Sequence, residues 1–248
     1  MLFSKGFTIG QKLRWISLLL RTGHDKRFHR TVKTIFGVLD RDRPVVIDVG
    51  ANVGNFVKAC ADQTPKPSLI IAIEPSAYVF GILSFWARMW ARHGTAIQCY
   101  KTALGDKDGM VDLNTPIKKS GSFRVGLASL GTFNNVPVHA ETVAMTSLDA
   151  LLACDGTDMV DLIKVDVEGA EALVLSGADH LFGVVRPVWY MELDERRADM
   201  FGGTARDIFD RFTTGGYDAY ILDDQARLTR VTAMTAASDY LFVPVARP

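Results

Sequence analysis

The sequence predicts an α/β fold built on a doubly wound, mostly parallel sheet. Two apolar runs, 45–49 and 69–73, read as buried strands, and a helical pattern lies between them. Each run carries a carboxylate at its end, Asp48 in the first case and Glu74 in the second. From Arg43 onward strand-like and helix-like segments alternate, which is typical of a parallel sheet covered by helices on both faces.

The elements follow from periodicity and from start signals. Pro75 fits a first helical position, and Ser147 fits an N-cap before Leu148. The segments 217–222 and 239–244 enclose turn-like sequence and predict an antiparallel hairpin that closes one edge of the sheet. We expect helices at 54–63, 76–92, 147–153, 169–179 and 204–214, and strands at 45–49, 69–74, 96–102, 109–113, 142–146, 160–166, 187–193, 217–222 and 239–244.

Composition limits the function classes. The chain has 248 residues, 28 Lys plus Arg and 28 Asp plus Glu, so its net charge is zero. A general nucleic-acid binder needs a basic face, so we expect no nucleic-acid partner. No apolar run is long enough for a transmembrane segment, and no secretory signal pattern is present, so we expect a cytoplasmic protein. The three cysteines are scattered and form no C-x-x-C pair, which favours reduced core residues over a disulfide framework.

Residues 1–43 form a basic N-terminal extension, expected to be helical, before the main domain at 44–248. The extension carries ten Lys or Arg against three Asp. Ile9, Leu13, Ile16 and Leu20 recur at helical spacing among basic residues. The common interpretation is that this face packs on the domain. The alternative is that the helix contacts anionic lipid or a phosphorylated substrate.

Residues 114–137 are long and irregular for a segment inside a compact domain. Their sequence is rich in glycine and asparagine and has little periodicity. Such an insertion is often a lid or an acceptor-binding loop, and otherwise it is a connection without a role.

A nucleoside site is predicted where the first strand meets its helix. Gly50 and Gly54 allow close backbone approach to a ligand, and Glu74 can accept hydrogen bonds from ribose hydroxyls. Asn52 replaces the middle glycine of a dinucleotide fingerprint. The Asp48 carboxylate would repel a pyrophosphate and suit a cation, which favours S-adenosylmethionine (SAM) over NAD. The alternative is a tight turn without a ligand.

A second acidic cluster follows the strand at 160–166. Lys164, Asp166 and Glu168 alternate along the strand and point the same way, toward the crevice at the carboxyl ends of the strands. They can position an acceptor hydroxyl, take its proton or neutralise a cation. The alternative is a structural ion pair, with Glu171 at a helix N-terminus. Glu192 ends the next strand and borders the same crevice.

Other candidates near this cluster are weaker. Asp166, Glu168 and Glu192 are compatible with a divalent cation, but nothing in their spacing requires one, so no metal site is assigned. His139 is a distant third candidate for a general base, because a loop histidine is usually a surface residue.

These residues together resemble the FkbM family of SAM-dependent methyltransferases. The resemblance covers residues 45–245 and rests on three motifs: Val46-Ile-Asp48-Val-Gly50-Ala-Asn52-Val-Gly54, Glu74-Pro75 with Ala103-Leu-Gly-Asp106, and Thr146-Ser-Leu-Asp149 followed by Ile163-Lys164-Val-Asp166-Val-Glu168-Gly-Ala-Glu171. Glu192 and the segment 239–244 complete the set. The run from Lys164 to Gly169 is the most specific of these motifs.

The resemblance implies a Rossmann-like sheet of seven strands and transfer of a methyl group from SAM to a hydroxyl, with S-adenosylhomocysteine as product. Acceptors would be sugars in glycans or secondary metabolites. By motif match, Asp48, Gly50, Asn52, Gly54 and Glu74 line the SAM pocket, Asp106 lies near the adenine, and Asp166 and Glu168, with Lys164, face the reacting methyl. Two alternatives stay open, an NAD-dependent sugar-modifying enzyme and a non-catalytic binding module.

Overall fold

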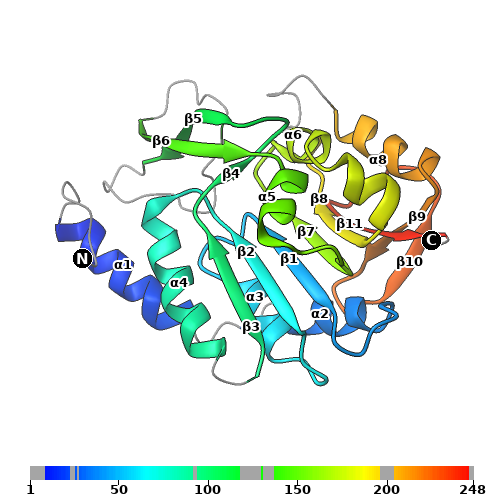
Figure 1. Ribbon diagram of the computed structural model, residues 1–248, viewed down its shortest axis with the longest axis horizontal. Coiled ribbons are helices and arrows are strands. Elements are labelled where there is room, and N and C mark those ends of the chain that lie inside the picture. Colours follow the sequence, from blue (N-terminus) through cyan, green and yellow to red (C-terminus); the bar gives the residue numbers. More distant parts are fainter. Residues whose placement is uncertain are drawn as a thin grey trace.

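The computed structural model describes residues 9–22, 26, 28–91, 94–117, 130, 137–195 and 204–245. Helices cover both faces of a central sheet, and a small second sheet lies beside it (Figure 1). The central strands are β1 (Val45–Val49), β2 (Leu69–Ile73), β3 (Ala96–Tyr100), β7 (Leu162–Val165), β8 (Val188–Glu192), β9 (Tyr217–Leu222), β10 (Leu228–Val231) and β11 (Asp239–Pro244). The second sheet contains β4 (Ala103–Leu104), β5 (Gly109–Pro116) and β6 (Val138–Thr146).

Among the described residues, two helices precede the first strand, and the others connect strands. The helices are α1 (Ile9–Thr22), α2 (His29–Phe36), α3 (Asn55–Ala61), α4 (Ala77–Ala91), α5 (Leu148–Asp155), α6 (Glu171–Ser176), the π-helical turn η2 (Leu181–Val185) and α8 (Ala205–Thr214). The expected cap of α5 is present, because the Ser147 side chain accepts a hydrogen bond from the backbone N–H of Ala150 at 3.1 Å.

The order of the strands places a switch point between β1 and β7. The central sheet runs β10-β9-β11-β8-β7-β1-β2-β3. The chain proceeds from β1 through β2 to β3 on one side, and from β7 to β8 on the other, all in parallel. Ligands of open α/β sheets bind outside the carboxyl ends of the strands at such a point.

Each parallel strand supplies side chains to two cores. Ile47, Ile71 and Ile163 pack on one face with α5, α6 and α8. Their neighbours Val46 and Ile70 pack on the other face with α2, α3 and α4. Because side chains alternate along a strand, a strand buried on both faces must be apolar throughout. This explains why these strands are apolar except for Asp48 in β1 and Lys164 in β7, which pair with each other.

The α/β class, the mostly parallel sheet and the antiparallel edge are confirmed, but the expected count of seven strands is wrong. An eighth strand, β10, pairs with β9 at the edge, in sequence that we interpreted as turn. β11 pairs with β8 and β9 and thus lies between them. The expected strands at 109–113 and 142–146 belong to the separate sheet as β5 and β6. Pairing partners decide this, and local sequence does not encode them.

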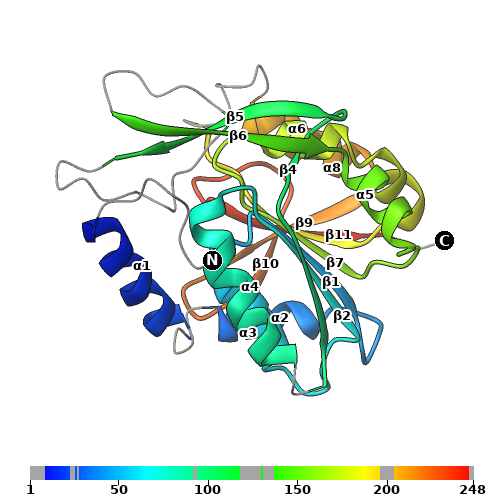
Figure 2. The same ribbon diagram turned by 60° about the vertical axis from the view of Figure 1, so that its left-hand side comes forward.

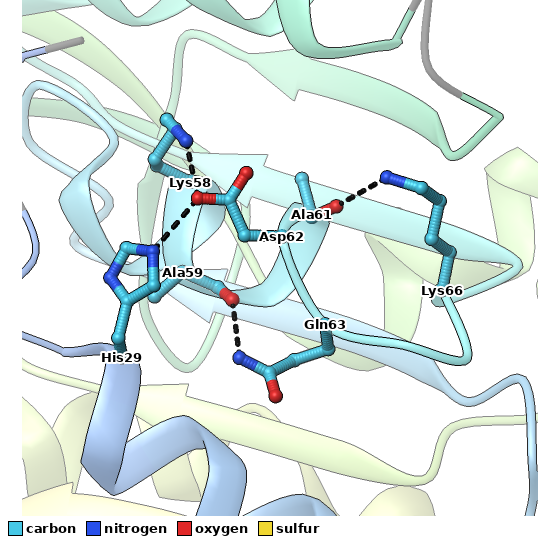
Figure 3. Close-up of polar contacts among 7 residues, drawn as sticks. All are labelled: His29, Lys58, Ala59, Ala61, Asp62, Gln63 and Lys66. Carbon is cyan, nitrogen blue, oxygen red and sulfur yellow. Dashed lines mark hydrogen bonds and ion pairs between the residues drawn. The ribbon is translucent and has the colours of Figure 1, made fainter. Parts of the chain in front are cut away.

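The N-terminal helix α2 is fixed to α3. Figure 3 shows Asp62, just after α3, bound both by Lys58 and by His29 at the start of α2. The His29 Nε2–Asp62 Oδ2 distance is 2.8 Å. Side chains of Gln63 and Lys66 donate to carbonyls in the last turn of α3, where carbonyls lack helical partners. α2 also places two fully buried side chains, Val32 and Ile35, in the core.

Helix α1 lies against the outer side of α4 (Figure 2). Trp15 is buried there, and its Nε1 donates a hydrogen bond of 2.8 Å to the carbonyl of Tyr78. The expectation that Ile9, Leu13, Ile16 and Leu20 dock the helix is wrong, because all four are exposed. Within the part of the chain that the structure describes, no helix is both long and apolar enough to cross a bilayer.

Gly50 is required by a close backbone contact. Its φ is +74°, and a Cβ at this position would lie 1.9 Å from the carbonyl oxygen of Asp166. Gly156, after α5, has nearly the same φ of +72° but nothing within 4 Å of its Cβ position. We therefore expect Gly50→Ala to lower the free energy of unfolding by at least about 4 kcal/mol or to prevent folding, and Gly156→Ala to cost only about 1–2 kcal/mol.

Urea unfolding of the two variants measures this difference. Because both substitutions add the same left-handed backbone strain, the excess cost at Gly50 isolates the clash with the carbonyl of Asp166, just after β7. Equal stabilities would show that the loop after β1 can move away from Asp166.

Candidate functional site

A cavity of about 410 Å³ opens at the switch point. Residues at the carboxyl ends of β1, β2, β7 and β8 line it, together with β4, the start of β11 and Phe28 just before α2. Its volume falls in the range of about 300–1,000 Å³ that is usual for small-molecule sites. The cavity is therefore where the topology predicts a ligand.

The loop after β1 is tied to the end of β2. The backbone N–H groups of Gly50 and Ala51 both donate to the carbonyl of Ile73 at 3.0 Å. Asn52 has a left-handed φ of 51°, and its N–H donates to Glu74 Oε2 at 2.9 Å. Glu74 thus holds the loop in place while lining the cavity.

Glu74 is a buried carboxylate with two backbone donors. Besides Asn52, the N–H of Ser76 donates to Oε1 at 2.8 Å. Burial raises the pKa of Glu74 to about 7, with Glu141 and Asp48 adding to the rise, while the two N–H groups oppose it. The carboxylate retains free lone pairs for donors of a ligand.

Lys164 forms two ion pairs beneath the cavity. Its Nζ lies 3.1 Å from Asp48 Oδ1 and 3.3 Å from Asp166 Oδ2. Burial lowers the pKa of Lys164, but Asp166 and Asp48 outweigh this and raise it above its usual range. Burial also disfavours the charged form of Asp48 and raises its pKa, although the nearby ammonium of Lys164 lowers it. The ammonium stays charged and offsets the two carboxylates.

Glu168 sits in a strained loop between β7 and α6. Its φ is 57°, and Gly169 follows with a φ of 104°. The buried side chain of Glu171 accepts hydrogen bonds from the N–H groups of Val167 and Gly169, both at 3.1 Å. A left-handed glutamate is rare and needs such support. The loop thereby keeps Glu168 among the residues that line the cavity.

Two further acids adjoin Asp166. Glu192 ends β8, and Asp239, its register partner, begins β11. Burial raises the pKa of Glu192 to about 8, helped by repulsion from Asp166 and by a hydrogen bond with it. The pKa of Asp239 is also raised by burial, although the Tyr190 hydroxyl donates to it at 3.2 Å. At neutral pH Glu192 therefore keeps its proton and can donate a hydrogen bond to Asp166.

Most of the predicted site residues meet at the cavity. It is lined by Gly50, Asn52, Glu74, Lys164, Asp166, Glu168 and Glu192. The remaining candidates lie elsewhere. Asp48 is fully buried and reaches the cavity through Lys164, its register partner on β7. Gly54 caps α3 against Leu83 and Trp90. Asp106 is in an exposed turn, and His139 is on β6.

Sequence reasoning missed Phe28, Thr102, Tyr190 and Asp239 as lining residues. The signal for Asp239 is present in the sequence, because an antiparallel strand starts where its parallel neighbour ends. An acid that begins such a strand therefore lies at the same edge as Glu192. Phe28 had no such signal, since only the packing of its ring edge-on against Phe56 places it there.

The charge of the cavity selects against anions. Among the described residues that line it, five carry carboxylates, Glu74, Asp166, Glu168, Glu192 and Asp239, and one, Lys164, carries a cation. Within the part of the chain that the structure describes, no three or more His, Cys, Asp or Glu form a group with the geometry of a metal site. The arrangement favours a cationic ligand with hydroxyl groups.

The raised pKa values predict a pH-dependent stability. Glu74 and Glu192 titrate at about 7 and about 8 when folded, but near their ordinary value of 4.5 when unfolded. Between the unfolded pKa of 4.5 and the folded pKa values, the folded state therefore binds more protons than the unfolded state. The free energy of unfolding falls as pH rises through this range. We expect a loss on the order of 5 kcal/mol as pH rises from about pH 5 to about pH 8, and little further change above that.

Denaturant unfolding at a series of pH values measures this slope. Glu192→Gln should flatten the upper part of it, since the glutamine has no proton to lose. Asp179→Asn, which changes an exposed carboxylate on the surface, should leave the slope unchanged. A wild-type stability that rises across this range would contradict the assignment.

Known proteins share this architecture and sequence pattern. A family model described as the Methyltransferase FkbM domain matches residues 48–219. The chain belongs to the FkbM methyltransferase family. The match spans the loop after β1, Glu74 and the acidic end of β7, so the expected resemblance is confirmed.

Two curated relatives and one solved structure are similar to this FkbM chain. It is 27% identical over 159 residues to the 2-O-methyltransferase NoeI of Sinorhizobium fredii (strain NBRC 101917 / NGR234), covering 58% of this chain and 61% of NoeI. It is 27% identical over 208 residues to the AMB antimetabolite synthetase AmbE of Pseudomonas aeruginosa, covering 73% of this chain and 10% of AmbE. The crystal structure of a methyltransferase FkbM from Methylobacillus flagellatus KT matches with a TM-score of 0.53 at 14% identity, covering 94% of this chain and 60% of that one.

These similarities differ in what they support. The chain spans about three fifths of NoeI and a tenth of AmbE, so the activities of those whole proteins do not transfer to it directly. The solved structure, at its low identity, supports the fold.

Proposed function

We propose that this FkbM-family chain is a SAM-dependent O-methyltransferase that acts on a hydroxyl of a sugar, a glycan or a secondary metabolite. The proposal rests on one observation: Glu74 and the acidic residues at the ends of β7 and β8 line the same cavity. The family match supports methyl transfer, and the similarity to NoeI, a 2-O-methyltransferase, supports a hydroxyl acceptor.

The residues of the cavity fit SAM. Glu74 presents a carboxylate, fixed by two backbone N–H groups, to which the two ribose hydroxyls can donate. The excess of carboxylates suits the positive sulfonium and ammonium groups. A dinucleotide would instead bring a pyrophosphate into a negatively charged cavity, which is unfavourable.

When bound, SAM supplies an electrophilic methyl group on a sulfonium. The protein must align the acceptor oxygen with that methyl group and remove the hydroxyl proton. Asp166 is the proposed base, because Lys164 favours its ionised form while Glu192 keeps its own proton. Glu168, held by the loop at Glu171, is the proposed residue that orients the acceptor hydroxyl.

Calorimetric titration with S-adenosylhomocysteine, and separately with NADH, tests the cofactor. We expect micromolar binding of the former and none of the latter. Transfer of labelled methyl groups from SAM to a panel of sugars then tests the acceptor. Binding of NADH alone would overturn the proposal, and binding of S-adenosylhomocysteine without turnover on any hydroxyl acceptor would favour a non-catalytic module.

A further inference from the structure

Helix α1 has apolar side chains on two opposite faces. Its inner face docks on α4, where Trp15 is buried and donates to the Tyr78 carbonyl. Two more hydrogen bonds fix it, from Trp86 Nε1 to the Leu19 carbonyl at 2.8 Å and from the Tyr78 hydroxyl to the Gln11 carbonyl at 2.7 Å. The helix is therefore held in place without its outer face.

The outer face is a continuous aliphatic stripe. Ile9, Leu13, Ile16 and Leu20 are 78%, 63%, 42% and 65% exposed. Their spacing of four, three and four residues aligns them along about 16 Å of one helix face. Single exposed leucines are ordinary, but four large aliphatic side chains in one row indicate a surface that binds something apolar.

The charges beside the stripe indicate what kind of surface it binds. On a helical projection Lys12 flanks the stripe on one side and Arg21 on the other, while Arg14 lies further round toward the inner face, where its charge reaches Tyr78. Residues 9–22 contain no Asp or Glu. A second copy of this helix would bring like charges together across the contact. A bilayer of anionic lipid would instead accept the aliphatic side chains and attract the flanking cations.

We propose that α1 is a peripheral membrane anchor, which lies in the surface of an anionic bilayer with Ile9, Leu13, Ile16 and Leu20 inserted. The Trp15 face stays packed on α4, so binding needs no unfolding of the domain. The anchor also lies close to the site, because Pro75, two residues before α4 begins, lines the cavity.

Flotation of the full-length protein with phospholipid vesicles tests the proposal. We expect binding to vesicles of phosphatidylcholine mixed with phosphatidylserine, and little binding to pure phosphatidylcholine. The triple variant Leu13→Ser, Ile16→Ser, Leu20→Ser should bind at least about tenfold more weakly. Arg21→Gln should weaken binding about fivefold, and added salt should do the same.

A matched control removes exposed apolar side chains outside α1. Met110 on β5 and Val184 on η2 are 65% and 56% exposed, and Met110→Ser with Val184→Ser should leave vesicle binding unchanged. Thermal unfolding of every variant checks the fold. Failure of the wild type to bind anionic vesicles would overturn the proposal, as would binding that survives the triple variant. So would a concentration-dependent dimer, seen by sedimentation without vesicles and abolished by the triple variant, since the stripe would then be an interface between copies.

Discussion

Replacing Asp166 with asparagine is expected to lower kcat by about 10²- to 10⁴-fold, the usual contribution of a positioned general base. The asparagine would keep the shape of the side chain but could not take a proton from the acceptor hydroxyl. It would also leave Lys164 with Asp48 as its remaining ion-pair partner among the contacts described above. Because Glu74 is untouched, the affinity for S-adenosylhomocysteine should change little.

Steady-state kinetics and calorimetry on the same variant separate these effects. The matched control is Asp179→Asn, an exposed acid paired with Arg211, which should keep full activity. The pH profile gives a further test. Since burial and Asp166 raise the pKa of Glu192 to about 8, wild-type kcat/KM should change as Glu192 loses its proton in that region, and Glu192→Gln should abolish that change. An Asp166→Asn enzyme with normal kcat would remove Asp166 from the chemistry.

The second large effect is expected at Glu74. Glu74→Ala removes the carboxylate that we propose to receive two ribose hydroxyls, and hydrogen bonds to a charged group contribute about 1.5–3 kcal/mol each. We therefore expect the affinity for S-adenosylhomocysteine to fall by about 10²- to 10⁴-fold. The N–H of Asn52 also loses its acceptor, so part of this loss would come from a less ordered loop.

Calorimetric titration measures the affinity, and Glu141→Gln is the matched control. Glu141 accepts a hydrogen bond from the N–H of Ala77 at 3.1 Å and is close enough to raise the pKa of Glu74, but it does not line the cavity. Its loss should leave affinity almost unchanged. Wild-type affinity should also increase as pH rises through about 7, because Glu74 becomes ionised and accepts both hydroxyls. Unchanged binding by Glu74→Ala would place the ribose elsewhere.

Much of the fold could be predicted because its parallel strands are buried on both faces. Such strands are almost wholly apolar, and acids mark their carboxyl ends (Asp48, Glu74 and Asp166), so β1, β2 and β7 were found within one or two residues. The edge was harder to predict. β10 is exposed and pairs with one neighbour, so its sequence carries little of the apolar pattern that reveals a central strand.

The site residues were also predicted from the strands, but their orientation was not. Polar residues in a buried strand end are conspicuous, which is how Lys164, Asp166 and Glu192 were found. Whether a carboxylate faces the cavity or a partner beneath it depends on the register of the neighbouring strand. Asp48 lies opposite Lys164 on β7, and that pairing directs it away from the ligand. Nothing near Asp48 in the chain encodes this.

The sequence by itself thus determined the class of sheet, the two acid-terminated strands and the family pattern, because these follow from local periodicity and residue type. Only the tertiary structure decided which face of α1 is buried. Either the four aliphatic residues or Trp15 could pack against the domain, and the helical periodicity of the sequence predicts that the aliphatic residues do. The domain instead takes Trp15, whose indole has a backbone acceptor on α4, and leaves the stripe outside. The choice depends on a hydrogen-bond partner 63 residues away, which no local pattern contains.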